Sequence, residues 1–236
     1  VVAVIHVSRM DSMGSDLTVA NAARVSFAKH KEELDEGDEK LIKYLATHGH
    51  WSPFSHAFIQ FKIDAPIFVA RQLQKHQVGL AWNEVSRRYV DSTPEFYSPP
   101  EWRRRAADKK QGSMSEPIAS QSIANGIMKE AYDASLKAYS RLLRLTATPR
   151  HKAEIACVNA YNKLLRMDVC PEQARMVLPQ SLMTSWYWTG SVYAFSRVCN
   201  LRLKEDAQAE TREVAQSISD HCAIMFPISW KHLIQG

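Results

Sequence analysis

The hydrophobic side chains of this chain alternate in some segments and recur at helical spacing in others. Residues 57–63 place Ile59, Phe61 and Ile63 on one side of an extended chain and Gln60 and Lys62 on the other. This alternation predicts a strand with one buried face. Residues 2–7 and 182–190 are rich in β-branched or aromatic side chains and predict two more strands.

Helical spacing dominates most of the remaining chain. It predicts helices over residues 17–27, 40–48, 118–145, 153–166, 191–202, 207–225 and 228–234, and a short helix between Pro171 and Pro179. Separate strand and helix segments predict an α+β fold with a central, mostly antiparallel sheet flanked by helices. The segments 118–145 and 153–166 would form a long helical layer. A length of 236 residues with 45% hydrophobic content suits a single domain spanning residues 1–236.

The stretch from Ala65 to Tyr89 carries the most concentrated candidate chemistry. Pro66 suits the first turn of a helix, and from there Gln72, Lys75 and His76 would share one helical face. An amide, a cation and an imidazole would then face the same way.

Beyond a break expected at Gly79, polar residues alternate along the chain. Glu84, Ser86 and Arg88 would point to one side of an extended segment. A carboxylate, a hydroxyl and a guanidinium together can accept from an N–H, donate to a carbonyl and hold a phosphate, as a pyrimidine nucleotide requires. The same spacing also fits a polar strand edge with a salt bridge.

Charge and composition leave more than one class of function open for this protein. A net charge of +5 and a pI near 9.0 suit either a nucleic-acid partner or a site for several phosphates. The basic stretch 102–113 has no periodicity and reads as a surface loop, with nucleic-acid binding as the alternative. No apolar run approaches the ~20 residues that cross a bilayer, and residues 1–7 are too short for a signal peptide, so we expect a soluble, cytoplasmic protein.

Neither cysteines nor histidines predict a metal site or a disulfide framework. The four cysteines are widely spaced and form no CxxC pair, so we expect buried thiols. His48, His50 and His56 are clustered, but no cysteine or carboxylate follows them at ligand spacing. We therefore expect no metal.

Residues 75–77 and 83–89, which read Lys-His-Gln and Asn-Glu-Val-Ser-Arg-Arg-Tyr, resemble the signature of the flavin-dependent thymidylate synthases. That signature is Arg-His-Arg, a short spacer, then Ser-x-Asn-Glu-x-Ser-x-Arg-Tyr. Lys75 and Gln77 stand where the family has arginines, Ala81 replaces the first serine, and the spacer is one residue longer. Further blocks resemble the family in the same order, at residues 23–27, 48–56, 174–179 and 201–212; in the second of them Ser55 replaces a glutamate. The resemblance covers most of the chain except about residues 103–163.

The resemblance implies methylation of dUMP to dTMP, with methylenetetrahydrofolate as carbon donor and NADPH as reductant through bound FAD. It implies a homotetramer in which Gln72 reaches a nucleotide across a subunit interface. Arg202 would be the catalytic residue, stabilising negative charge as the uracil ring ionises at N3. Nucleotide contacts are implied for Gln72, Lys75, Glu84, Ser86, Arg88, Arg175 and Arg202, and flavin contacts for Ser26, Ser52, Lys75, His76, Gln77, Glu84, Ser191 and Arg197.

Two alternatives remain beside this interpretation. One is flavin-dependent one-carbon transfer to another pyrimidine nucleotide. The other is a nucleic-acid-binding protein that uses the basic stretch 102–113. No cysteine nucleophile is expected, because in this family the reduced flavin supplies hydride equivalents directly.

Overall fold

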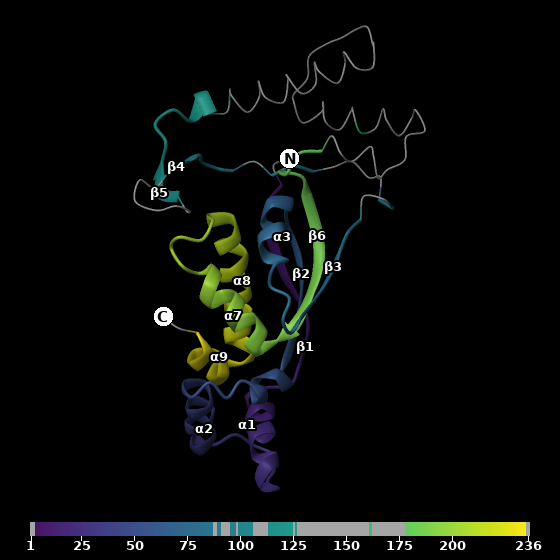
Figure 1. Ribbon diagram of the computed structural model, residues 1–236, viewed down its shortest axis with the longest axis vertical. Coiled ribbons are helices and arrows are strands. Elements are labelled where there is room, and N and C mark those ends of the chain that lie inside the picture. The colour runs from purple at the N-terminus through teal and green to yellow at the C-terminus, as the bar shows by residue number, and fades with distance from the viewer. Residues whose placement is uncertain are drawn as a thin grey trace.

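A four-stranded antiparallel sheet forms the centre of the molecule (Figure 1). The structure is a computed structural model, and it describes residues 3–86, 89–90, 95–97, 99–105, 113–124, 126, 161 and 178–234. The strand order is β1-β2-β6-β3, with β1 at His6–Met13, β2 at Phe58–Pro66, β3 at Leu80–Glu84 and β6 at Met183–Ser191. This sheet and its helices confirm the predicted α+β class.

The central pair β2–β6 runs in register from Phe58 opposite Ser191 to Pro66 opposite Met183. Burial alternates along β2, with Ile59, Phe61 and Ile63 on the covered side, because successive side chains of a strand point to opposite faces. At the end of β6, Gly190 lets the β3 side approach closely. A Cβ on Gly190 would lie 2.8 Å from the carbonyl oxygen of Gly79 and would also collide with the Leu80 side chain.

The helices α3 at Ile67–Leu73, α7 at Val192–Arg202 and α8 at Ala209–Met225 cover the side of the sheet to which these apolar residues point (Figure 1). The helices α1 at Asp16–Arg24, α2 at Glu36–Thr47 and α9 at Pro227–Leu233 pack on one another at one end of this layer. Two 3-10 turns accompany them, η1 at Val25–Phe27 and η2 at Ser52–His56. Trp186 and Trp188 are buried in the shared core, and Trp82 stacks on Trp186 with ring centroids 4.5 Å apart.

A buried carboxylate joins the first helix of the chain to the last one described. Asp16, at the start of α1, accepts hydrogen bonds from the backbone N–H groups of Ile228 and Ser229, both at 2.8 Å. These are N–H groups of the first turn of α9, which have no partner inside the helix. Asp16 therefore fixes α9 against α1.

The basic stretch is more ordered than its composition predicted. Residues Arg103–Arg105 form β4 and pair with β5 at Ser113–Pro117, so the prediction of an irregular loop is wrong for these residues. Residues 106–112 lie outside the described part of the chain.

Three further predicted boundaries were wrong. The first strand was expected at residues 2–7, but β1 runs from His6 to Met13. It pairs with β2 along this length as an edge strand, where polar side chains can face outwards, so its polar residues did not reveal it. The helix after Pro66 was expected to include His76, but α3 ends at Leu73. Extended pairing of β3 ends at Glu84, before Ser86.

Most other predictions that fall on described residues are confirmed. The strands at 57–63 and 182–190 and the helices at 17–27, 40–48, 191–202, 207–225 and 228–234 all appear, with shifted ends. The helices predicted at 118–145, 153–166 and 171–179 lie almost wholly outside the described residues, where only 121–124, 126 and 161 are helical.

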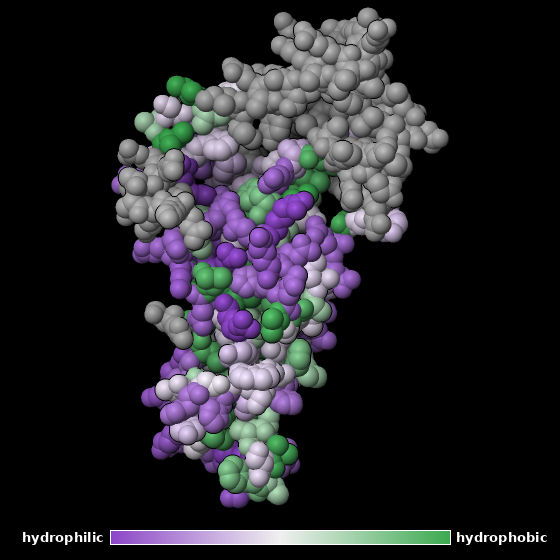
Figure 2. Space-filling model, in the orientation of Figure 1, coloured by the Kyte–Doolittle hydropathy of each residue, from purple (hydrophilic) through white to green (hydrophobic). Residues whose placement is uncertain are grey.

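Within the residues described, no helix is long and apolar enough to span a membrane. In the same residues, no group of three His, Cys, Asp or Glu side chains is arranged to hold a metal ion. Figure 2 shows mostly polar side chains across the middle of the face turned to the viewer, with hydrophobic residues in small groups.

Candidate active site

The last turn of α3 meets the end of α7 at the guanidinium of Arg202. Arg202 Nε donates to His76 Nε2 at 3.0 Å, and Arg202 Nη2 donates to the backbone carbonyl of Gln72 at 3.1 Å. A guanidinium has five N–H donors, so these bonds use two of them. Among the described residues the other three have no partner, which leaves them available to a ligand.

The side chain of Gln72 is fixed by the start of α8. Its Nε2 donates to Oε1 of Gln208, and its Oε1 accepts from the Thr211 hydroxyl at 3.2 Å. With one bond on each side of the amide, its orientation is determined. Gln72 therefore connects α3, α7 and α8 at one point.

The region around Arg202 is positively charged. Lys75 and Arg197 are exposed, Arg202 is partly buried, and none of the three forms an ion pair in the described part of the chain. Burial first, then the charges of Arg202 and Arg197, lower the pKa of His76 to about 4. Burial also lowers the pKa of Arg202 from its ordinary value. A partly desolvated positive cluster of this kind attracts anions.

A tight turn brings the chain from α3 back to the sheet beside α7. Gly79 has a φ of +77°, which favours glycine, and a Cβ there would lie 3.2 Å from Cβ of Ala194. Ser191 lies close by, buried, where it caps α7 by accepting from the backbone N–H of Ala194 at 3.2 Å. Ser191 therefore has a capping role whatever else it binds.

Glu84 and Ser86 follow this turn but make separate contacts. Glu84 is exposed, and its carboxylate accepts from the Thr184 hydroxyl at 2.8 Å and from the Trp82 indole at 3.3 Å. The carbonyl of Ser86 accepts from the backbone N–H groups of Tyr89 and Val90. The expected convergence with Arg88, and the expected position of Arg175, lie outside the described residues.

Lys75 and Gln77 are both exposed on the turn after α3, flanking His76. The expectation of a helical face is wrong, yet the structure brings Gln72 and His76 together through Arg202. Ser26 in η1 and Ser52 in η2 are exposed on other elements, and η2 packs on α1.

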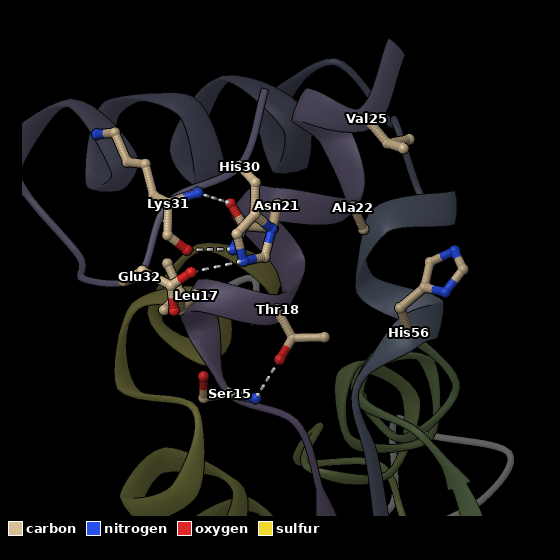
Figure 3. A pocket seen from close by; sticks show the side chains of 10 residues that line it. All are labelled: Ser15, Leu17, Thr18, Asn21, Ala22, Val25, His30, Lys31, Glu32 and His56. Carbon is tan, nitrogen blue, oxygen red and sulfur yellow. Dashed lines mark hydrogen bonds and ion pairs between the residues drawn. The ribbon is translucent and has the colours of Figure 1, made fainter. Parts of the chain in front are cut away.

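A hollow of about 480 Å³ lies between α1, the segment at residues 30–32 and the end of η2 (Figure 3). Two of its polar side chains are already engaged within the chain. Asn21 exchanges hydrogen bonds of 2.8 and 3.0 Å with the backbone of Lys31, and Thr18 accepts from the backbone N–H of Ser15 at 3.0 Å. The hollow does not include Gln72, His76 or Arg202, so it is distinct from the positive cluster.

Sequence reasoning missed three side chains that form hydrogen bonds with the candidate residues Gln72 and Glu84. Gln208 and Thr211 fall within the block 201–212 that resembles the family, so their position could have drawn attention to them. Thr184 carried no such signal, because only strand pairing places it beside Glu84.

The described cysteines are not poised for nucleophilic chemistry. Cys199 and Cys222 are buried free thiols, and burial raises the pKa of each well above its ordinary value. A thiol must ionise to become a strong nucleophile. Cys157 and Cys170 lie outside the described residues.

Residues 9–228 match the family model described as thymidylate synthase complementing protein. The chain belongs to this family. It is 34% identical over 233 residues to a flavin-dependent thymidylate synthase of Thermus thermophilus, covering 96% of this chain and 76% of that protein. It is 35% identical over 213 residues to one of Thermotoga neapolitana, covering 90% and 83%. The chain is therefore an enzyme, a methyltransferase of the flavin-dependent thymidylate synthase family.

Solved structures of this fold include the UMP/dUMP methylase PolB of Streptomyces cacaoi bound with 5-Br dUMP. Its TM-score is 0.77 at 28% identity, with 98% of this chain and 94% of that chain covered. The same enzyme bound with 5-Br UMP gives a TM-score of 0.75 at 26% identity.

Proposed function

We propose that this enzyme methylates dUMP to dTMP, taking the carbon from methylenetetrahydrofolate and the electrons from NADPH through FAD. A methylene group must gain two electrons to become a methyl group, and NADPH supplies them overall. The proposal rests on one observation above all. The Arg202 guanidinium is fixed by His76 and Gln72 within a positive cluster that has no described carboxylate partner.

The residues present fit ligands that carry phosphates. Lys75 and Arg197 offer exposed cations beside His76, and Gln77 adds an amide. Gly79 provides the tight turn that packs this segment against Ala194 of α7, where a side chain would be crowded. Lys75, Gln77 and Arg197, with Ser191 and Glu84, would hold FAD, and Ser26 and Ser52 are proposed as further contacts. FAD when bound supplies the hydride-transfer chemistry that the protein side chains lack.

Arg202 would act on the nucleotide. Its free N–H donors can meet the uracil ring as negative charge develops on it, and their fixed orientation means that little reorganisation accompanies the reaction. Gln72, Lys75, Glu84, Ser86, Arg88 and Arg175 are proposed to bind the nucleotide around it. We also propose a homotetramer with sites shared between subunits.

The direct test measures tritium release from dUMP labelled at C5, with FAD, NADPH and methylenetetrahydrofolate present. Wild-type enzyme should release tritium and form dTMP, and Arg202→Ala should lower the rate by about 10²–10³. Flavin reduction by NADPH, measured separately, should change much less. Absence of release from wild-type enzyme with all components present would refute the proposal.

UMP is a second candidate substrate. The similarity to a UMP/dUMP methylase over 98% of this chain and 94% of that one favours it. The same assay with UMP labelled at C5 separates the two nucleotides by their kcat/KM values. Nucleic-acid binding is less supported, because Arg103 of the basic stretch is paired within the chain to Glu210.

A further inference from the structure

His76 stands in the family signature as a flavin contact, but in this structure its ring nitrogen faces Arg202. Arg202 Nε donates to His76 Nε2 at 3.0 Å. From this contact we propose that His76 is a positioning residue, a neutral hydrogen-bond acceptor that fixes the Arg202 guanidinium for the nucleotide. The inference rests on the proposed role of Arg202 and adds a residue that acts through it.

The protonation state of His76 follows from its partner. The Nε–H of arginine can only donate, because a guanidinium has no acceptor. His76 Nε2 must therefore carry a lone pair, and in the neutral ring the proton lies on Nδ1. Burial and the nearby charges of Arg202 and Arg197 favour this neutral form.

The geometry explains why one acceptor matters so much. Arg202 comes from the last turn of α7, and its flexible side chain crosses to α3, where Gln72 supplies only a backbone carbonyl at 3.1 Å. One bond leaves the guanidinium free to rotate about the N–H···O axis. The second bond, to His76, removes that rotation, so the three remaining donors keep one direction.

Variants of His76 separate this role from a flavin contact. His76→Gln keeps an acceptor of similar reach, and His76→Leu removes it at similar size. We expect His76→Leu to lose about 10–100-fold in kcat for tritium release, because the Arg202 Nε–H then has no acceptor. His76→Gln should recover most of that loss. FAD affinity should change little in either. The exposed His30, which faces Glu32 at 3.6 Å, supplies the control His30→Leu, which should behave as wild type.

The decisive measurement is a double-mutant cycle in the holoenzyme. If His76 acts only through Arg202, His76→Leu should cause no further loss once Arg202 is alanine, both in tritium release and in dUMP binding by calorimetry. Equal losses in both backgrounds would overturn the inference, as would a loss that saturating FAD restores. If wild-type enzyme neither releases tritium nor binds dUMP, the proposed function itself fails and this role with it. An active wild type with independent losses would refute only the role of His76.

Discussion

Arg103 of β4 donates from Nη2 to Oε1 of Glu210 in α8 at 2.7 Å. Glu210 is 4% exposed, so its carboxylate is almost completely removed from water. The pair holds the small β4–β5 sheet to the first turn of α8. Glu210 directly precedes Thr211, whose hydroxyl donates to Gln72. Burial, and after it the charge of Glu210, raises the pKa of nearby Tyr97 to about 12.

Removing one partner of this pair should destabilise the protein. Arg103→Ala leaves the Glu210 carboxylate buried without its ion-pair partner. The free energy of unfolding should fall by about 2–3 kcal/mol. This is below the range for fully buried pairs because Arg103 is partly exposed. Thermal unfolding should show a fall in Tm of about 5–10 °C. Combining Arg103→Ala with Glu210→Gln should recover part of the loss, because no unpaired charge remains. Arg9→Ala, at an exposed arginine, serves as the control, and an equal shift there would contradict the explanation.

The Gln72 amide offers a second test, in activity. Gln208→Ala and Thr211→Val each remove one of the two bonds that orient it, and each should lower kcat/KM for dUMP by about fivefold to tenfold, the value of one hydrogen bond. Gln72→Ala should cost at least as much. Adding Gln208→Ala to Gln72→Ala should then change nothing further. An additional loss would show that Gln208 acts elsewhere.

Two glycines with similar backbone angles separate conformational strain from crowding. Gly79 and Gly49 have φ values of +77° and +70°, but only at Gly79 would a Cβ meet a neighbour, Ala194 at 3.2 Å. Gly49→Ala should cost about 1 kcal/mol from the left-handed conformation alone. Gly79→Ala should cost about 1 kcal/mol more and also weaken FAD binding, because the turn moves away from α7. Denaturant unfolding and flavin titration would measure both effects, and equal costs at the two sites would remove the crowding argument.

The periodicity of the chain predicted most described elements but not their ends. The helix after Pro66 was expected to continue to His76, yet it ends at Leu73 because the chain must turn at Gly79 to pair β3 with β6. Helical spacing thus grouped Gln72 with His76 for the wrong reason. What brings them together is Arg202, which hydrogen-bonds to His76 and to Gln72 although it lies 126 and 130 residues away from them in the sequence.

Contacts of this range leave no local pattern in a sequence. Asp16 binds the start of α9 across 212 and 213 residues, and Thr184 binds Glu84 across 100. Resemblance to a family supplied Arg202 and His76 as candidates. Only the fold shows that they contact each other and that Gln208 holds the Gln72 side chain.

His76 should also leave a signature in the pH dependence of stability. Its pKa is lowered to about 4 in the folded protein, against about 6.5 when unfolded, so the unfolded chain binds the proton first as pH falls. The stabilisation is complete above pH 6.5 and is lost progressively between about pH 6.5 and 4. For this partly exposed ring we expect a total of about 1–2 kcal/mol after allowing for solvent screening. His76→Gln should flatten the free energy of unfolding over that range, and an unchanged profile would show that another group is responsible.

The final prediction concerns the two departures from the flavin motif, Lys75 and Gln77. Both are exposed on the turn after α3, and within the described residues Lys75 has no carboxylate partner, so either side chain is free to meet a phosphate. An ammonium makes point-charge contacts where a guanidinium makes two parallel hydrogen bonds, and an amide adds no charge. FAD binding by this enzyme should therefore be weak and sensitive to salt. The double change Lys75→Arg with Gln77→Arg should lower the FAD dissociation constant by about tenfold for each ~1.4 kcal/mol gained.

The exposed Arg71, on the preceding turn of α3, provides the matched control for this change. Arg71→Lys should leave the dissociation constant as it is, since Arg71 does not belong to the motif. Fluorescence titration at two salt concentrations would show whether the tightening is electrostatic. If the added arginines leave the affinity for FAD unchanged or weaken it, FAD does not contact positions 75 and 77. The cation that the motif lacks is then supplied by Arg197, whose charge already acts on His76.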